Sequence, residues 1–125
     1  MSKTKKILVT MRLNKNVLQV STNNPIPTRL KEIRKKANIS QKELGVRIGI
    51  DESSASARMN QYEKGKHTPD ISTLKKMADE LGVPLSYFFC EDESSAKLVC
   101  LIAEMSDNEK RDLIKKMESS KPTPK

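Results

Sequence analysis

The chain holds 125 residues, with 24 lysines and arginines against 16 acidic residues and a net charge of +8. This length allows one compact domain with appendages. With no Trp, two Tyr and two Phe, the core must rest on aliphatic and methionine side chains. No apolar run approaches the roughly 20 residues that span a membrane, and Ile7-Leu8-Val9 is too short for a signal peptide. One His and two separated cysteines make no metal-ligand set. Cys90 and Cys100 fit a reducing cytoplasm, with a disulfide between them as the less favoured interpretation.

Residues 1–27 are expected to form a basic arm and linker. Residues 1–36 hold ten basic residues and one acid, Glu32, whereas the rest of the chain is close to neutral. This excess predicts salt-sensitive attraction to a polyanion, with solubility as the plainer explanation. The loose alternation of apolar and polar residues over residues 6–20 suggests a small β-hairpin. The alternatives are that this segment is disordered or that Met11 is the true start of the chain. Pro25 and Pro27 predict an extended linker.

Two helices are predicted next. The first runs from about Thr28 to Ala37 and turns three apolar side chains inward: Leu30, Ile33 and Ala37. The second begins at the capping box formed by Ser40 and Glu43. It carries Leu44 and Ile48 on one face, and Gly45 between them allows another helix to approach closely.

A third helix follows the second after a short polar segment. Gly49 is placed to end the second helix, and the N-cap candidates for the third are Asp51, Ser53 and Ser54. Its inward positions recur at i, i+4 and i+7, namely Ala55, Met59 and Tyr62. Gly65 is expected to stop it.

The fourth and fifth helices complete the predicted core. Asp70 is the expected N-cap of the fourth helix, Gly82 ends it, and its inner face consists of Leu74, Met77, Ala78 and Leu81. Pro84 opens a short fifth helix, whose core residues are Leu85, Phe88 and Phe89.

Residues 91–119 predict a C-terminal helical extension. A broad apolar helix contains Ala96, Leu98, Val99, Cys100, Leu101, Ile102, Ala103 and Met105. A second capping box, Ser106 with Glu109, precedes another helix bearing Leu113, Ile114 and Met117. The two helices can pack back on the fifth helix or pair with a second protomer, and dimerisation is favoured. No heptad seam is sustained, which argues against a long coiled coil. Residues 120–125 are expected to be disordered.

Five motifs stand in order within the predicted helices: Leu30-Lys-Glu-Ile-Arg34, Ser40-Gln-Lys-Glu-Leu44, Tyr62-Glu-Lys-Gly65, Pro69-Asp-Ile-Ser-Thr-Leu74 and Ala78-Asp-Glu-Leu-Gly-Val-Pro84. Each is weak alone, but together they resemble the helix-turn-helix domain of the lambda repressor/Cro (XRE) family. The resemblance implies an all-α fold, with a five-helix lambda-repressor-like DNA-binding domain at residues 28–90 whose third helix reads DNA. The expected function is a sequence-specific transcriptional regulator, a repressor that binds a palindromic double-stranded DNA operator as a homodimer in the cytoplasm.

The resemblance also assigns the DNA-binding residues. Gln41 matches the phosphate contact at the start of the second helix. The predicted DNA-facing set is Gln41, Ser54, Ser56, Ala57, Arg58, Asn60, Gln61, Lys64 and Lys66. Arg58 could bind guanine, Gln61 adenine and Ala57 a thymine methyl group, while Lys64 and Lys66 suit phosphate. Arg34 and Glu63 match a structural ion pair of the family.

One departure from the family pattern affects these assignments. The segment between the second helix and Tyr62 is about four residues longer than usual. Either the turn is longer or the third helix starts a turn earlier, so the positions near Ser54 and Ser56 are less certain than Asn60 and Gln61. Asp51 and Glu52 would repel phosphate, unless they instead read a cytosine amino group.

Other classes of function fit less well. An antitoxin or another protein-interaction module with a DNA-binding domain is the main alternative, with its partner on the C-terminal helices. An enzyme is not expected, because the single His67 has no paired nucleophile or metal cluster. No cofactor is predicted. RNA binding would call for stacking aromatic residues that the chain lacks.

Overall fold

The computed structural model describes residues 24–120. The hairpin predicted over residues 6–20, the basic arm before residue 24 and the tail from residue 121 lie outside this part. The described chain contains α-helices, one 3-10 helix and no strand, and the elements are α3 Ile26–Lys36, α4 Gln41–Arg47, α5 Glu52–Glu63, α6 Ile71–Leu81, η1 Leu85–Phe89, α7 Glu93–Ala103 and α8 Asp107–Ser120. The predicted all-α fold, five helices followed by a helical extension, is confirmed.

Local capping explains why most of these helices begin where they do. The N-cap side chains of α4 to α7, which are Ser40, Asp51, Asp70 and Asp92, each accept a hydrogen bond from a backbone N–H of the first turn. At α8 the capping box is complete, because Ser106 and Glu109 exchange bonds of 2.8 and 3.1 Å. At α4 it is half formed. There Glu43 pairs with Arg47 instead of returning to Ser40.

The first helix begins earlier than the sequence predicted. Pro25 is the N-cap of α3, and the side-chain oxygen of Asn24 accepts a hydrogen bond of 3.0 Å from the Ile26 N–H. Pro27 is tolerated there because first-turn N–H groups have no intrahelical partner. The prediction of an extended linker up to residue 27 is therefore wrong for residues 26 and 27, which are helical. Ala37, predicted to point inward, is the exposed C-cap residue.

One core joins the first five helices. Its fully buried large side chains come from α3, α4, α5, α6 and η1: Leu30, Leu44, Met59, Leu74, Met77 and Phe88. Phe89 was predicted to close this core, but it is 45% exposed and Tyr87 is buried instead. In a 3-10 helix residues i and i+3 share a side, so Phe88 follows Leu85 inward while Phe89 turns outward.

The α4 and α5 helices pack closely at a glycine. A Cβ added to Gly45 would lie 2.8 Å from the Cβ of Ala55 and 3.1 Å from its carbonyl oxygen. The predicted close approach at Gly45 is therefore present. Gly49, with φ of +97°, ends the α4 turn in the left-handed conformation. Asp51 is the N-cap of α5, which begins at Glu52. The helix therefore starts about one turn earlier, relative to Tyr62, than in the family pattern. This earlier start accounts for the extra residues between the second helix and Tyr62.

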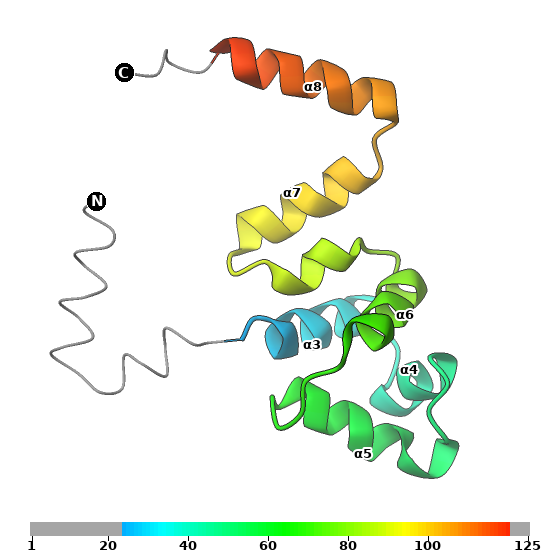
Figure 1. The fold of residues 1–125 in the computed structure, drawn as a ribbon. Coiled ribbons are helices and arrows are strands. Elements are labelled where there is room, and N and C mark those ends of the chain that lie inside the picture. The colour runs from blue at the N-terminus through cyan, green and yellow to red at the C-terminus, as the bar shows by residue number, and fades with distance from the viewer. Residues whose placement is uncertain (1–23, 121–125) are drawn as a thin grey trace, which may run out of the picture.

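The C-terminal extension leads away from this core. Figure 1 shows α4 and α5 at one end of the molecule and α8 at the other, with α7 between them. α7 packs on η1, where Ala96 is buried, whereas no residue of α8 is buried. Ser120, assigned to a disordered tail from the sequence, is the last residue of α8 and its hydroxyl donates to the Lys116 carbonyl at 2.8 Å.

Candidate nucleic-acid interface

α5 has one buried face and one polar face. Ala55, Met59 and Tyr62 are buried in the core, which leaves the opposite face toward solvent at helical spacing. Of the predicted contact residues, those that are exposed are Ser56, Ala57, Arg58, Asn60, Lys64 and Lys66, and those that are half-buried are Gln41, Ser54 and Gln61. Ser56 and Arg58 lie on opposite flanks of the polar face, while Ala57 and Asn60 lie near its centre.

A buried ion pair fixes the end of α5 against α3. The guanidinium of Arg34 donates two hydrogen bonds to the Glu63 carboxylate, 2.5 Å from Nε and 3.1 Å from Nη2. Arg34 also donates to the Ile39 carbonyl at 2.8 Å. The bidentate contact expected between Arg34 and Glu63 is present, and both residues are about nine-tenths buried.

Gln41 connects this ion pair to the polar face. Its side-chain amide donates to Glu63 Oε1 at 3.0 Å and to Asn60 Oδ1 at 3.3 Å. The first residue of α4 is thereby held to a residue late in α5. Since Glu63 is itself fixed by Arg34, three helices determine where Gln41 and Asn60 point.

Acidic groups near the polar face are occupied by partners within the protein. Glu52 pairs with Lys42 at 3.1 Å, and Glu43 pairs with Arg47. Hydrogen bonds from the side chain and backbone of Ser53 lower the pKa of Asp51, whose carboxylate caps α5. The remaining charges on and just beyond α5 are Arg58, Lys64 and Lys66, so this end presents positive charge to a ligand.

The loop after α5 adds residues that sequence reasoning did not assign to the interface. The backbone N–H groups of Lys66 and His67 both donate to the Gln61 carbonyl, which folds the loop onto the end of α5. His67 and Thr68 line a hollow of about 370 Å³ together with Arg58, Gln61 and Tyr62. Only the backward fold of the loop joins these residues, and no spacing in the sequence indicates it.

Metal-binding geometry is not found in the part of the chain that the structure describes. No group of three or more His, Cys, Asp and Glu side chains in residues 24–120 could hold a metal ion. No helix among them is long and apolar enough to cross a bilayer.

Known proteins match this chain in sequence and in fold. The helix-turn-helix family model (HTH_3) matches residues 30–88. The crystal structure of the transcriptional regulator BswR superposes with a TM-score of 0.67 and 40% identity, covering 75% of this chain and 93% of that one.

Two relatives of known name are also regulators of transcription. The HTH-type transcriptional regulator ImmR of Bacillus subtilis is 36% identical over 69 residues, which is 55% of this chain and 51% of ImmR. The chain thus spans about half the length of that relative. The cryptic phage CTXphi transcriptional repressor RstR of Vibrio cholerae is 26% identical over 97 residues, covering 74% of this chain and 84% of RstR. All three named relatives are regulators of transcription.

Proposed function

The chain belongs to the helix-turn-helix family of transcriptional regulators, and on that premise we propose that it is a sequence-specific repressor of transcription. It binds a palindromic double-stranded DNA operator as a homodimer, in the cytoplasm and on the nucleoid when bound. The observation that carries this proposal is α5, which is buried on one face and polar on the other, and whose end is fixed to α3 by the Arg34–Glu63 pair. A helix of this kind suits the DNA major groove.

The contacts divide into those that position the protein and those that choose the sequence. Arg58 and Gln61 are the base readers, for guanine and adenine respectively, with Ser54, Ser56 and Ala57 beside them. Lys64 and Lys66 contact phosphate, as does the start of α4 at Gln41. His67 and Thr68 lie at the edge of this surface.

Selection of bound sites from a random duplex pool tests this function directly. A palindromic motif with half-sites about ten base pairs apart is the expected result. If no motif is recovered and binding is weak and salt-sensitive at every sequence, the operator-binding function is wrong.

Substitutions on α5 and in the loop after it separate base reading from phosphate contact. Arg58→Ala and Gln61→Ala are each expected to weaken operator binding by about 1–3 kcal/mol and to relax sequence preference. Lys66→Ala should weaken all sequences alike and flatten the salt dependence by about one unit. Affinities for the operator and a scrambled duplex, measured at several salt concentrations, distinguish the two classes. Unchanged discrimination in Arg58→Ala and Gln61→Ala would contradict the assignment of base readers.

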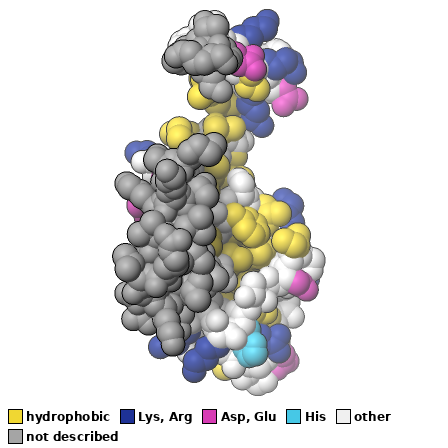
Figure 2. Space-filling model, turned by 60° about the vertical axis from the view of Figure 1, so that its left-hand side comes forward, with side chains coloured by type: hydrophobic (Ala, Val, Ile, Leu, Met, Phe, Trp, Pro, Cys, Tyr) yellow, Lys and Arg dark blue, Asp and Glu magenta, His cyan; other side chains and the backbone are white. Residues whose placement is uncertain are grey.

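The proposed homodimer rests on an apolar surface of the extension. The exposed apolar side chains of α7 and α8 are Leu98, Leu101, Ile102, Ile114 and Met117, and all but Ile102 are more than half exposed. Figure 2 shows hydrophobic side chains at the neck that joins the upper end of the molecule to the rest. An isolated helix of this length is marginal in water, so α8 calls for a partner surface.

A second copy of this chain is the occupant that fits. α8 carries four basic and four acidic residues, so its surface has no net charge that would repel an identical helix. Two-fold pairing also matches the symmetry of a palindromic operator. The alternative, an antitoxin whose α7 and α8 cover another protein, uses the same apolar surface. It predicts a toxin-like reading frame beside the gene and a monomer when purified alone.

A further inference from the structure

Arg29 is a second buried arginine of α3, and it reaches the connection between η1 and α7. The residue is only 4% exposed. Its Nε donates to the Cys90 carbonyl at 2.8 Å, and its Nη1 donates to Glu93 Oε2 at 3.1 Å. Cys90 follows η1 and Glu93 opens α7. One guanidinium therefore holds both ends of the short connection that sets the direction of α7.

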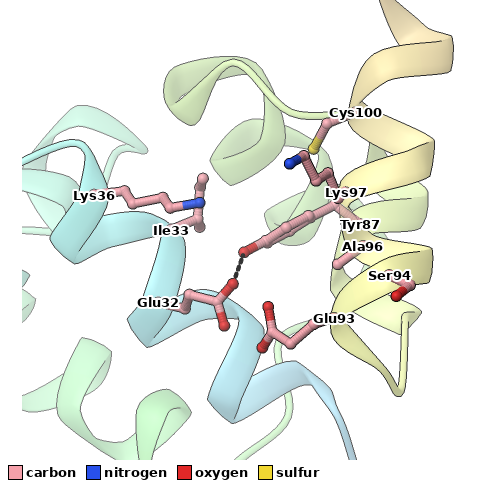
Figure 3. Close-up of a pocket in the computed structure, with 9 residues that line it drawn as sticks. All are labelled: Glu32, Ile33, Lys36, Tyr87, Glu93, Ser94, Ala96, Lys97 and Cys100. Carbon is pink, nitrogen blue, oxygen red and sulfur yellow. Dashed lines mark hydrogen bonds between the residues drawn. The ribbon is translucent and has the colours of Figure 1, made fainter.

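Two further residues complete this junction. Glu32 accepts from Arg29 Nη1 at 3.1 and 3.2 Å, and the Tyr87 hydroxyl donates to Glu32 Oε2 at 3.0 Å. The guanidinium carbon also lies 6.0 Å from the centre of the Tyr87 ring. Figure 3 shows the Tyr87–Glu32 bond, with Glu93 of α7 turned toward Glu32. Every member thus has a partner, and the buried charge of Arg29 is compensated.

The space beside the junction is hollow. A cavity of about 340 Å³ between α3 and α7 is lined by Ile33 and Lys36 on one side and by Lys97 and Cys100 on the other (Figure 3). Because side chains do not fill this space, packing leaves room for α7 to tilt. The polar junction links the start of α7 directly to α3, while the buried Ala96 holds α7 against η1.

From this geometry we propose that Arg29 is a positioning residue that fixes the angle between the DNA-binding helices and the extension. This role of Arg29 rests on the proposed homodimer. α3 connects the two parts of the molecule. Arg34 joins it to α5 through Glu63, and Arg29, five residues earlier, joins it to α7 through Glu93. In a dimer joined through α7 and α8, this angle determines the separation of the two α5 helices, and with it the half-site spacing that the protein accepts.

The test loosens the junction at its exposed member. Glu93→Gln removes the carboxylate that pairs with Arg29, and the Glu93 side chain is 75% exposed, so the fold is not at risk. Glu91→Gln is the matched control, since Glu91 lies in the same connection and makes no side-chain hydrogen bond or ion pair with the described residues. Tyr87→Phe is a second variant that removes only the hydroxyl.

Two measurements are made on the full chain. Affinity is compared for duplexes whose half-sites are at the selected spacing, one base pair closer and one base pair farther apart, and for a duplex with one half-site. Residual dipolar couplings report independently whether α7 keeps a fixed orientation relative to α3 without DNA.

Among the DNA affinities, only the preference for one half-site spacing over another is expected to change. In Glu93→Gln the preference for the selected spacing over its neighbours should fall by about tenfold, while binding to one half-site is unchanged and the couplings of α7 shrink. Equal losses on all duplexes would overturn the proposal, because a merely structural role lowers every affinity. Unchanged couplings would also overturn it. If the chain proves monomeric, the homodimer is wrong, yet the couplings still decide whether the junction fixes α7.

Discussion

Gln41 illustrates how far a residue's role depends on its neighbours. Both hydrogens of its side-chain amide are used within the protein, on Glu63 and Asn60. The donor left for a phosphate at this position is its backbone N–H, which lies in the first turn of α4 where such groups have no intrahelical partner. Asn60, whose oxygen is occupied by Gln41, presents its amide NH₂. It is therefore suited to donate to a base or phosphate oxygen, and not to bind adenine through both atoms.

The Arg34–Glu63 pair gives a prediction at this scale. Glu63→Gln leaves Arg34 buried with a weakened partner, whereas Glu63→Met leaves its guanidinium with the Ile39 carbonyl but with no carboxylate. The second change should cost about 3–5 kcal/mol in the free energy of unfolding, measured by urea denaturation. The double variant Arg34→Met/Glu63→Met should recover most of that loss, because replacing both members of a buried pair is often neutral.

DNA affinity distinguishes a purely structural pair from one that also orients the interface. The double variant lacks the carboxylate that accepts from Gln41, so its operator affinity should stay low even where its stability is restored. An affinity equal to that of the parent chain would show that Glu63 has no part in placing Gln41.

Among the elements, the α4–α5 contact is the most restricted. Gly45→Ala puts a methyl group 2.8 Å from the Ala55 Cβ and 3.1 Å from a backbone oxygen. Overpacking of this kind costs about 1–3 kcal/mol, measurable as a lower denaturation midpoint. Adding Ala55→Gly removes the nearest clash but not the one with the carbonyl. The double variant should therefore be only partly rescued, and full stability in Gly45→Ala alone would contradict the close approach.

The three aspartate caps predict a dependence of stability on pH. Hydrogen bonds from Ser53, Thr73 and Ser95 lower the pKa values of Asp51, Asp70 and Asp92 below the ordinary 3.8. Depressed pKa values in the folded state mean that the caps contribute stability above about pH 3.8, which is lost as the pH falls through the folded values.

Serine caps without titrating, so a triple Asp→Ser variant separates capping from charge. Thermal unfolding between pH 7 and pH 2.5 should show a shallower acid loss in this variant than in the parent. Parallel curves would mean that other carboxylates account for the acid loss.

Local chemistry made the ends of the helices predictable. Caps such as Asp70 and end-glycines such as Gly49 act within a few residues, so the sequence alone indicated them. The errors came where a local rule has two outcomes. Pro27 is compatible with either a linker or a first turn, and the apolar pattern at Phe88 and Phe89 does not reveal a 3-10 period. The contacts of Gln41 with Glu63 and of Arg29 with Glu93 join residues far apart in the chain, which no pattern of spacing indicates.

At the scale of the whole molecule, the proposed function needs two DNA-binding units held at a fixed distance. The described chain places its α5 and its apolar extension at opposite ends (Figure 1). A second copy can therefore pair through α7 and α8 and leave both α5 helices free. Each half-site then adds to the affinity of the other, because the second contact is made within one complex.

Substitution in the apolar surface tests this arrangement. Leu101, which is 51% exposed on α7, is expected to be buried between protomers, so Leu101→Lys places a charge there and should give a monomer in sedimentation velocity. Affinity for the palindrome should fall by about a hundredfold or more toward that of one half-site, because the linkage between half-sites is lost. Binding to a single half-site should be unchanged, since Leu101 lies far from α5.

Ile71→Lys is the matched control, because Ile71 is a similarly exposed apolar residue, at 59%, on α6 and outside the extension. It should leave the assembly intact and should not lower the affinity for the palindrome, because the added lysine lies three residues after Thr68 at the edge of the proposed DNA surface. A Leu101→Lys variant that still sediments as a dimer would place the interface elsewhere on the molecule. Arg29 would then have to influence the half-site spacing through a different pair of helices. The residual dipolar couplings of α7 would remain the only independent test of whether Arg29 fixes the orientation of α7.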